Sequence, residues 1–260
     1  MVELLGKEPP NGLARWDGPS LASELDVSVH SVWAVLRKEG IHLQRQRSWC
    51  ISTDKDFAAK AADIVGLYLA PPLNAIVICV DEKPSMQALE RKTGFVKTRN
   101  GKILSAYKST YKRHGTLNLF GALEVHTGKV TGKITEEKKR KDFIEFMDEL
   151  VSEYDPETEI HVILDNYCTH RKNEEWLSKH SNVHFHFTPT SASWLNQVEI
   201  WFGIFTRKVL RNASFASKGH LKEKIEAYIK SYNPNAEPFK WRKREVKGAQ
   251  LRNSIDNLIN

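Results

Sequence analysis

Three acidic residues stand where the sequence predicts that their carboxylates gather. Asp81 directly follows the apolar run 75–80, Asp165 directly follows the run 161–164, and Glu199 lies in an aromatic-rich helical segment. Because α/β sheets build their sites at the carboxyl ends of strands, the two aspartates are predicted to be neighbours. Helical spacing places Glu199 at the border of an apolar stripe. Its side chain is predicted to lie close enough to the packed face to point toward the sheet.

Carboxylates brought together without cationic partners repel one another, and a hard divalent cation neutralises them. Oxygen-only ligation with open positions suits Mg²⁺ or Mn²⁺. Two such ions about 3.5–4 Å apart activate a water or a 3′-hydroxyl and stabilise the leaving oxygen in phosphodiester displacement. Either aspartate alone is better explained as a turn or capping residue. The prediction therefore rests on all three acidic residues in this order.

The segments that carry these residues alternate between strand and helix patterns. Their order predicts an α/β fold in which a mixed sheet is flanked by helices. Strands are predicted at 75–80, 116–125, 129–134, 160–164 and 183–187, and helices at 53–70, 143–150, 171–179, 194–209 and 218–232. The residues at 126–128 have the composition of a hairpin turn, and the helix at 53–70 is predicted to start with a capping box at Thr53 and to stop at Pro71.

The N-terminal region has the pattern of a helix-turn-helix. Ser20 and Ser28 are predicted to cap two short helices, and Gly40 is predicted to end the second. The residues predicted to seal the two helices together are Leu21, Leu25, Val29, Val32, Val35 and Leu36. The second helix would offer its outward face to a DNA major groove, although an ordinary helical hairpin explains the same pattern.

Composition excludes several classes of protein. The chain has 260 residues, of which 40% are hydrophobic and 27% charged, so it is neither a disordered tail nor a rod. Its longest clean apolar run has six residues, too few for a transmembrane helix, and no signal peptide is seen. We expect the protein to stay in the cytosol. The three cysteines form no C-x-x-C pair, and His184 and His186 lack a third nitrogen ligand nearby, so no zinc site is predicted.

Charge is distributed unevenly along the chain. The net charge of +7 combines −3 in residues 1–82, +11 in 83–141, −9 in 142–204 and +8 in 205–260. This pattern of two basic blocks around an acidic one suits a protein that binds a polyanion around a cation-binding site. Solvated lysine side chains on surface helices would account for the same totals.

Three motifs match a known family. Val80-Asp-Glu-Lys83, Leu164-Asp-Asn-Tyr-Cys-Thr-His170 and the segment Thr188–Phe202 closely resemble the D-D-E transposases of the insertion sequence 630 family, in the mariner superfamily. The resemblance covers nearly the whole chain. It implies a ribonuclease H-like catalytic domain with Asp81, Asp165 and Glu199 as catalytic and metal-binding residues. The 33 residues between Asp165 and Glu199 are about one fewer than is usual in the family.

Polar neighbours of the three motifs are candidates for orienting ligands or for contacting DNA. The candidates beside the carboxylates are Glu82, Lys83, Asn166, His170, Asn196 and Gln197. The candidates for DNA binding elsewhere are His30, Ser31, Ala34, Arg37, Arg45, Arg47, Lys112 and Arg113. Solvated loop residues and helix caps are the alternative interpretation of both groups.

The resemblance implies a transposase that binds terminal inverted repeats, hydrolyses phosphodiesters there and joins the 3′ ends to target DNA at TA. It implies a homodimer with no membrane partner, associated with the nucleoid in the bacterial cytosol. The alternatives are a decayed remnant that only binds DNA and a structure-selective nuclease of the same fold. We expect a helix-turn-helix segment at 1–41, a linker and helix at 42–72, the catalytic domain at 73–212 and a basic helical region at 213–260. The family usually carries two helix-turn-helix units, so the chain is expected to be N-terminally truncated and weakly selective for its repeat.

Overall fold

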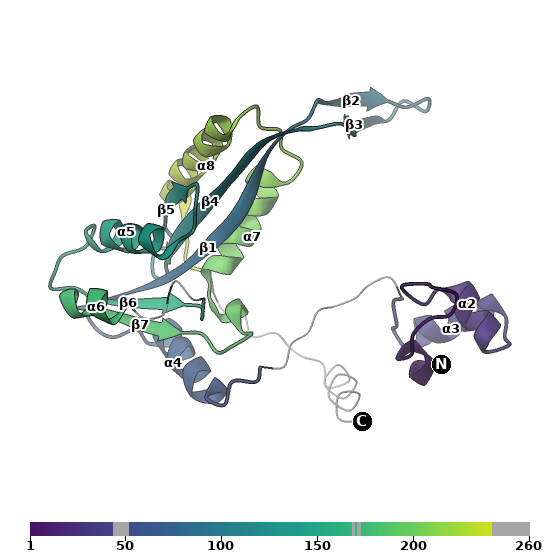
Figure 1. Cartoon of the computed structure of the whole chain (residues 1–260), viewed down its shortest axis with the longest axis horizontal. Coiled ribbons are helices and arrows are strands. Elements are labelled where there is room, and N and C mark those ends of the chain that lie inside the picture. Colours follow the sequence, from purple (N-terminus) through teal and green to yellow (C-terminus); the bar gives the residue numbers. More distant parts are fainter. Residues whose placement is uncertain (44–51, 168–169, 171–172, 241–260) are drawn as a thin grey trace. The chain divides into compact units, whose positions relative to one another are not determined.

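The computed structural model describes residues 1–43, 52–167, 170 and 173–240. The chain folds into two compact units, Met1–Ile51 and Ser52–Asn260 (Figure 1). Each unit has a hydrophobic core of its own.

Within residues 1–43, the first unit contains the helices α1 (Val2–Leu5), α2 (Gly18–Glu24) and α3 (Val29–Lys38). Ser28 caps α3 as predicted, but α2 begins earlier than expected because Asp17 is its N-cap and Ser20 completes the capping box. Trp16 and Leu36 are buried in the small core between α2 and α3. Val29 and Val35, which the sequence placed in this core, are exposed, because only one narrow stripe of α3 faces α2.

The second unit is built on a five-stranded mixed sheet in the order β5-β4-β1-β6-β7. β1 pairs antiparallel with β4 and parallel with β6, so it is the central strand. The strands are β1 (Ala75–Glu90), β4 (Lys112–Glu124), β5 (Val130–Thr135), β6 (Glu159–Leu164) and β7 (Val183–Phe187). The three inner strands are rich in β-branched and aromatic residues and are buried on both faces, as the apolar run of β1 predicts.

Helices cover both faces of this sheet (Figure 1). One face packs against α4 (Phe57–Leu69), α7 (Val198–Phe205) and α8 (Lys218–Tyr232). The other packs against α5 (Arg140–Val151) and α6 (Glu174–Lys179). This arrangement is the mixed sheet flanked by helices that the sequence predicts.

Two predicted helices differ in extent. The long helix expected at 194–209 is a short 3₁₀ turn (Ser193–Leu195), then α7, then a π-helical turn (Thr206–Leu210). Trp194 is 62% exposed and lies outside the apolar stripe. Helix α4 starts at Phe57 rather than Thr53, because Asp56 and not Thr53 occupies the N-cap position.

A two-stranded hairpin extends beyond the sheet, where β1 and β4 continue past its edge (Figure 1). Its strands are β2 (Thr93–Lys97) and β3 (Ile103–Tyr107), which pair antiparallel with each other and form a separate sheet. The hairpin leaves Phe95 79% exposed and Ile103 67% exposed. A last 3₁₀ turn, Asn233–Asn235, follows α8. In the part of the chain that the structure describes, no helix combines the length and the apolar character needed to cross a membrane.

Candidate active site

Asp81 lies within β1 and not at its end. Beyond Asp81, β4 continues to pair with β1 as far as Glu90, whereas the pairing with β6 stops where Cys79 faces Ile163. The prediction that the strand ends at Asp81 is wrong, because β4 supplies backbone partners for the polar residues that follow. Asp81 therefore stands where β1 has just lost its β6 neighbour, and it is 7% exposed.

Asp165 directly follows β6, as the sequence predicts. Cys79 opposes Ile163 in the parallel ladder, so the same register carried two residues further sets Asp81 beside Asp165. The Asp165 carboxylate accepts a hydrogen bond from the Tyr167 backbone N–H at 2.9 Å. The side chain remains 31% exposed, so Asp165 is open to solvent at the edge of the sheet.

Glu199 lies in the first turn of α7, beside the buried Val198. Helix α7 approaches the sheet closely because Gly121, the β4 residue opposite Asp81, has no side chain. A Cβ atom at Gly121 would lie 2.9 Å from Phe202 Cζ of α7. Side chains alternate along β1, so Asp81 shares with Cys79 the face that α7 covers. The first turn of α7 is thus on the face that carries Asp81.

The three carboxylates act on one another electrostatically. Burial, followed by the negative charge of Asp165, raises the pKa of Asp81 to about 8, and Glu199 contributes in the same direction. Burial is also the main cause that raises the pKa of Glu199, with Lys83 opposing and Asp165 adding to the shift. Mutual repulsion of this kind is what a bound cation relieves.

The donor set fits a hard divalent cation, since all three side chains offer oxygen and carry excess negative charge. Among the described residues, however, no three Asp, Glu, His or Cys side chains stand close enough to hold one ion together. Coordination of a shared ion by Asp81, Asp165 and Glu199 therefore requires these side chains to rotate inward.

His170 joins two of the candidate residues. Its ring is fully buried, with Nδ1 2.8 Å from Asp165 Oδ1 and Nε2 3.2 Å from Glu82 Oε1. Burial opposes its positive charge, but the hydrogen bonds to the two carboxylates raise the pKa of His170 to about 10. The ring packs 4.7 Å from that of Phe143 on α5. His170 thus holds Asp165 from the side of the sheet opposite to α7.

The segment before α7 is fastened to the sheet by buried polar groups. Asn196 donates from its side-chain amide to the carbonyl of Val80, the residue before Asp81, at 2.9 Å. Tyr68 of α4 donates to the Leu195 carbonyl at 2.7 Å and accepts from the Gln197 backbone N–H at 3.4 Å. Sequence reasoning missed Tyr68, because its place in an apolar helical stripe carries no signal of this contact. These bonds fix the start of α7, and with it Glu199.

The other two candidates beside the carboxylates have different surroundings. Lys83 acts electrostatically on Glu199, which places its charge at the edge of the site. Asn166 donates from its side-chain amide to the Thr188 carbonyl, and so connects the end of β6 to the end of β7. Lys83 therefore adds positive charge beside Glu199, whereas Asn166 makes a contact that supports the backbone.

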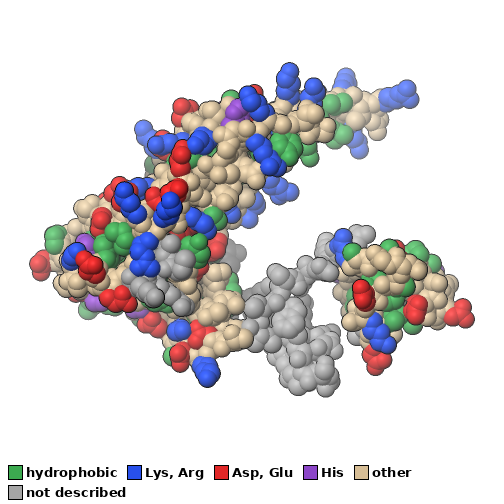
Figure 2. Space-filling view, in the orientation of Figure 1, with side chains coloured by type: hydrophobic (Ala, Val, Ile, Leu, Met, Phe, Trp, Pro, Cys, Tyr) green, Lys and Arg blue, Asp and Glu red, His purple; other side chains and the backbone are tan. Residues whose placement is uncertain are grey.

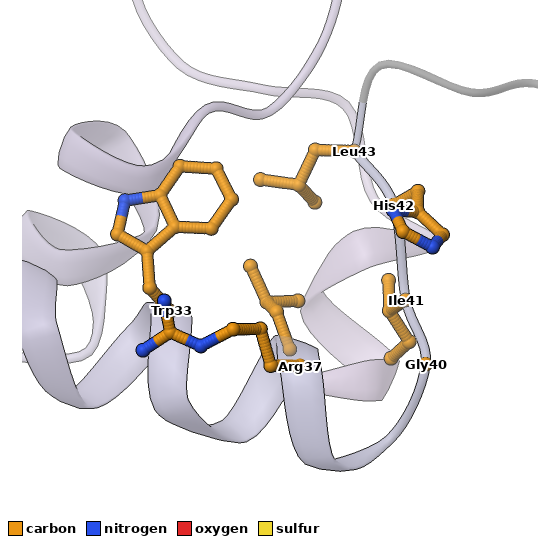
Figure 3. Close-up of a pocket in the computed structure, with 7 residues that line it drawn as sticks. Trp33, Arg37, Gly40, Ile41, His42 and Leu43 are labelled. Carbon is orange, nitrogen blue, oxygen red and sulfur yellow. The ribbon is translucent and has the colours of Figure 1, made fainter.

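The DNA-binding candidates of the first unit lie on the surface of α3. Its residues His30, Ser31, Ala34 and Arg37 are all exposed, although the Ser31 hydroxyl contacts the capping Ser28. Figure 3 shows Arg37 and Trp33 at the wall of a cavity of about 340 Å³ between α3 and the segment that follows it. Arg45 and Arg47 lie outside the described residues.

Basic side chains gather on the hairpin and on the adjoining ends of β1 and β4 (Figure 2). Residues 91–116 contain no Asp or Glu. The exposed cations of this basic hairpin surface are Lys92, Lys97, Arg99, Lys102, Lys108, Lys112 and Arg113. Arg113 also lies over the ring of Tyr111, with 5.4 Å from its guanidinium carbon to the ring centre. Lys112 and Arg113 are therefore part of a larger surface than the sequence singled out.

The histidines of β7 have a neighbour that the sequence analysis did not foresee. His161 of β6 lies with its Nδ1 2.9 Å from His186 Nε2, so a third nitrogen is present after all. His184 contacts Glu159 and His186 contacts Asp63, each through one carboxylate oxygen. His186 is partly buried and His184 is exposed, so of these two only His186 is packed against its neighbours.

Comparisons with known proteins indicate the same family as the sequence motifs. The sequence profile of the DDE superfamily endonucleases matches residues 76–222. The insertion element IS630 uncharacterized 39 kDa protein of Shigella sonnei is 28% identical over 118 residues, which are 45% of this chain and 34% of that protein. This chain therefore matches about a third of the length of that relative.

Two solved structures have a similar fold. The Mos1 strand transfer complex has a TM-score of 0.58 at 15% identity and covers 88% of this chain and 75% of its own. The Mos1 transposase paired-end complex with the left transposon end has a TM-score of 0.58 at 14% identity, covering 86% and 74%. The ribonuclease H-like fold implied by the sequence is confirmed. Since the profile spans more than half of its residues and the predicted resemblance to the insertion sequence 630 and mariner types is confirmed, the chain belongs to the DDE superfamily endonucleases.

Proposed function

We propose that this chain is a DNA transposase that cleaves phosphodiester bonds at the terminal repeats of its own element and joins the freed 3′ ends to target DNA at TA dinucleotides. The observation that carries the proposal is the mutual electrostatic effect of Asp81, Asp165 and Glu199 at one edge of the sheet. A structural role alone does not explain why three carboxylates from separate segments lie near enough to raise the pKa of Asp81 and of Glu199 in a partly buried site.

Asp81, Asp165 and Glu199 are the residues that would hold Mg²⁺ or Mn²⁺, which in pairs activates a water or 3′-hydroxyl and stabilises the leaving oxygen. The surrounding residues orient this set. His170 holds Asp165 through a charge-assisted hydrogen bond, and Asn196 keeps the start of α7 against Val80. Lys83 would meet a phosphate that enters beside Glu199.

The remaining surfaces account for DNA binding in this proposal. The basic hairpin surface supplies sequence-independent phosphate contacts, and the exposed face of α3 supplies limited base reading. Joining two element ends in one event requires two active sites, so the working form would be a homodimer. The same geometry would serve a structure-selective nuclease, which differs in having no preference for the element's ends.

Incubation of the protein with Mg²⁺ and duplexes that do or do not end in the element's terminal repeat tests the proposal. A transposase nicks at the repeat and, when supplied with a plasmid, joins the repeat's 3′ end to it. Cleavage of both duplexes alike would identify a structure-selective nuclease instead. DNA binding without metal-dependent cleavage would identify a remnant that has lost catalysis. Asp165→Asn is the matched control, because it removes one anionic ligand and retains the side chain's shape.

A further inference from the structure

The hairpin of β2 and β3 presents aromatic rings on one of its two faces. Side chains alternate between the faces of a strand, and residues paired directly across two strands share a face. Phe95 therefore lies on the same face as Thr93, and so does Tyr107, which pairs with Thr93. Phe95 is 79% exposed and Tyr107 is 60% exposed, so both rings are open to solvent. We call these two rings the aromatic face of the hairpin.

Tyr107 is held in place by contacts at the base of the hairpin. The guanidinium carbon of Arg91 lies 5.3 Å from the centre of the Tyr107 ring and 4.8 Å from that of the Tyr111 ring. Arg91 is itself anchored, because its backbone N–H donates to Ser214 Oγ at 2.8 Å. A guanidinium over a ring face is attracted to the ring. These contacts order Tyr107 before any ligand binds, which lowers the entropy that binding has to overcome.

Positive charge accompanies the aromatic face. Residues 91–116 contain no Asp or Glu, and the basic hairpin surface lies on the same segment (Figure 2). Lys97 follows Phe95 by two residues in β2, so its exposed side chain lies on the same face as the ring. A partner for this face must therefore be anionic, and it must also offer flat apolar groups to the rings.

An unpaired nucleic acid strand combines these two properties. Its phosphates meet the cations, and each base offers a flat face whose stacking on an aromatic side chain contributes about 1–3 kcal/mol. In a duplex the faces of the bases are covered by the neighbouring base pairs, so the rings of Phe95 and Tyr107 would reach only base edges and backbone. The exposed rings thus favour an unpaired strand over a duplex.

We propose that the aromatic face of the hairpin binds an unpaired DNA strand, with bases stacked on Phe95 and Tyr107 and with phosphates contacted by Lys97 and the other cations of the basic hairpin surface. Stacking on these rings requires no metal and no catalytic carboxylate. The choice of DNA rather than RNA rests on the proposed function. The experiment measures binding without cleavage, so its failure is distinguishable from that of the transposase assay.

The probes are two short labelled DNA strands of equal length and charge. One carries ordinary bases in a sequence that cannot pair with itself, and the other is abasic at every position. Fluorescence anisotropy of the full chain without divalent metal should show the base-bearing strand bound about tenfold more tightly, because only this strand can stack. The double change Phe95→Leu and Tyr107→Leu keeps the face apolar but removes its rings. The two strands should then bind with nearly equal affinity.

The matched control changes the opposite face of the same hairpin. Val96 and Leu104 pair with each other and are both exposed. The double change Val96→Ala and Leu104→Ala should therefore keep the preference for the base-bearing strand. The double leucine variant should bind a duplex of the same sequence within about twofold of the unaltered chain, because phosphate contacts do not depend on the rings.

Equal affinity of the unaltered chain for the two strands would overturn the proposal, and so would a preference that survives the double leucine change. Conversion of a dimer to a monomer by that change, with the preference intact, would assign the face to a second copy of this chain instead. Photo-cross-linking from strands that carry 5-iodouracil gives a readout that needs no variant. Cross-links are expected at Phe95 or Tyr107, and their absence from residues 91–111 would overturn the proposal.

Discussion

At the scale of single residues, the site is defined by which side of β1 each side chain faces. Asp81 points to the face covered by α7, and Glu82 points to the opposite face, where His170 binds it. Two adjacent acidic residues therefore have different surroundings. The Asp-Glu-Lys motif indicated that Asp81 was a candidate ligand. It did not indicate that the Glu82 carboxylate would pair with a buried histidine.

Replacing any of the three carboxylates should abolish cleavage. Asp81→Asn, Asp165→Asn and Glu199→Gln each remove one anionic ligand, so stabilisation of the charge that develops at the phosphate is lost. We expect DNA affinity to stay within about twofold, because phosphate contacts elsewhere provide most of it. Cleavage assays over a Mg²⁺ series, with gel-shift assays as the control, check this. A variant that cleaves at a rate near that of the unaltered chain would remove its residue from the site.

At the scale of elements, the sequence predicted the centre of the sheet and the helix at 218–232, but it missed β2, β3 and the continuation of β1 to Glu90. The apolar runs 75–80 and 160–164 predicted the centre of the sheet, because strands buried on both faces are continuous hydrophobic segments. The stripe at 194–209 suggested one long helix. The stripe did not indicate that the helix is interrupted before Val198. That interruption involves a hydrogen bond from Asn196 to the Val80 carbonyl, which is distant in sequence. Long-range polar bonds of this kind leave no periodic signal.

The same limit applied to the residues of the site. Asp81, Asp165 and Glu199 were found because each adjoins an apolar segment and matches a motif. Tyr68 and Gly121 were not found, because their roles depend on what lies across the fold, the Leu195 carbonyl for one and Phe202 for the other.

The approach of α7 to the sheet depends on Gly121. Gly121→Ala should destabilise the protein by about 1–3 kcal/mol, because the new methyl group would overlap Phe202 and push α7 outward. Urea denaturation measures this loss. The matched control is Gly66→Ala on the exposed side of α4, where a Cβ meets no atom within 4 Å. That change should stabilise the helix by about 0.5–1 kcal/mol. Equal effects of the two substitutions would contradict the close packing of α7.

The N-terminal end of α4 is joined to the loop before α7 by Asp54. Its carboxylate accepts from Lys60 and from the Thr190 backbone N–H, and these hydrogen bonds, Lys60 first, lower its pKa to about 2. The folded pKa is below the ordinary value of 3.8, so the stabilisation is present above about pH 4 and is lost as the pH falls toward 2.

We therefore expect Asp54→Asn to lower the melting temperature at neutral pH, and the difference from the unaltered chain to shrink as the pH falls from 5 to about 2. Melting curves over that range provide the measurement. Asp56→Asn is a suitable control, since the Asp56 side chain makes no capping hydrogen bond. A difference that stays constant with pH would show that the Asp54 carboxylate is not the stabilising group.

At the scale of the whole molecule, opposite charges are separated in space as well as in sequence. The hairpin and the adjoining ends of β1 and β4 carry the basic hairpin surface, whereas α5 and the start of α6 carry half of the acidic residues between 142 and 204. Such a separation orients a polyanion along one part of the protein and away from another.

Neutralising part of the basic hairpin surface should weaken binding to every DNA sequence alike. The triple change Lys97→Gln, Arg99→Gln and Lys102→Gln should make the logarithmic dependence of affinity on salt less steep by about 0.9 for each phosphate that the protein no longer neutralises. Fluorescence anisotropy over a salt series measures the slope. Lys179→Gln, which removes a lysine paired with Glu175 on α6, should leave it unchanged. An unaltered slope in the triple variant would mean that the hairpin does not bind phosphates.

The length of β1 predicts how far along bound DNA the hairpin contact lies from the cut. Each residue of a strand advances about 3.3 Å, so Glu90 at the base of the hairpin lies at most about 30 Å from Asp81, and two register shifts in this part of β1 shorten that distance. One turn of duplex DNA is about 34 Å, or ten base pairs. The hairpin should therefore touch the backbone about one helical turn from the cut, on the same side of the duplex. Hydroxyl-radical footprinting should show two protected patches about ten base pairs apart, and deletion of residues 93–107 should erase only the distant one.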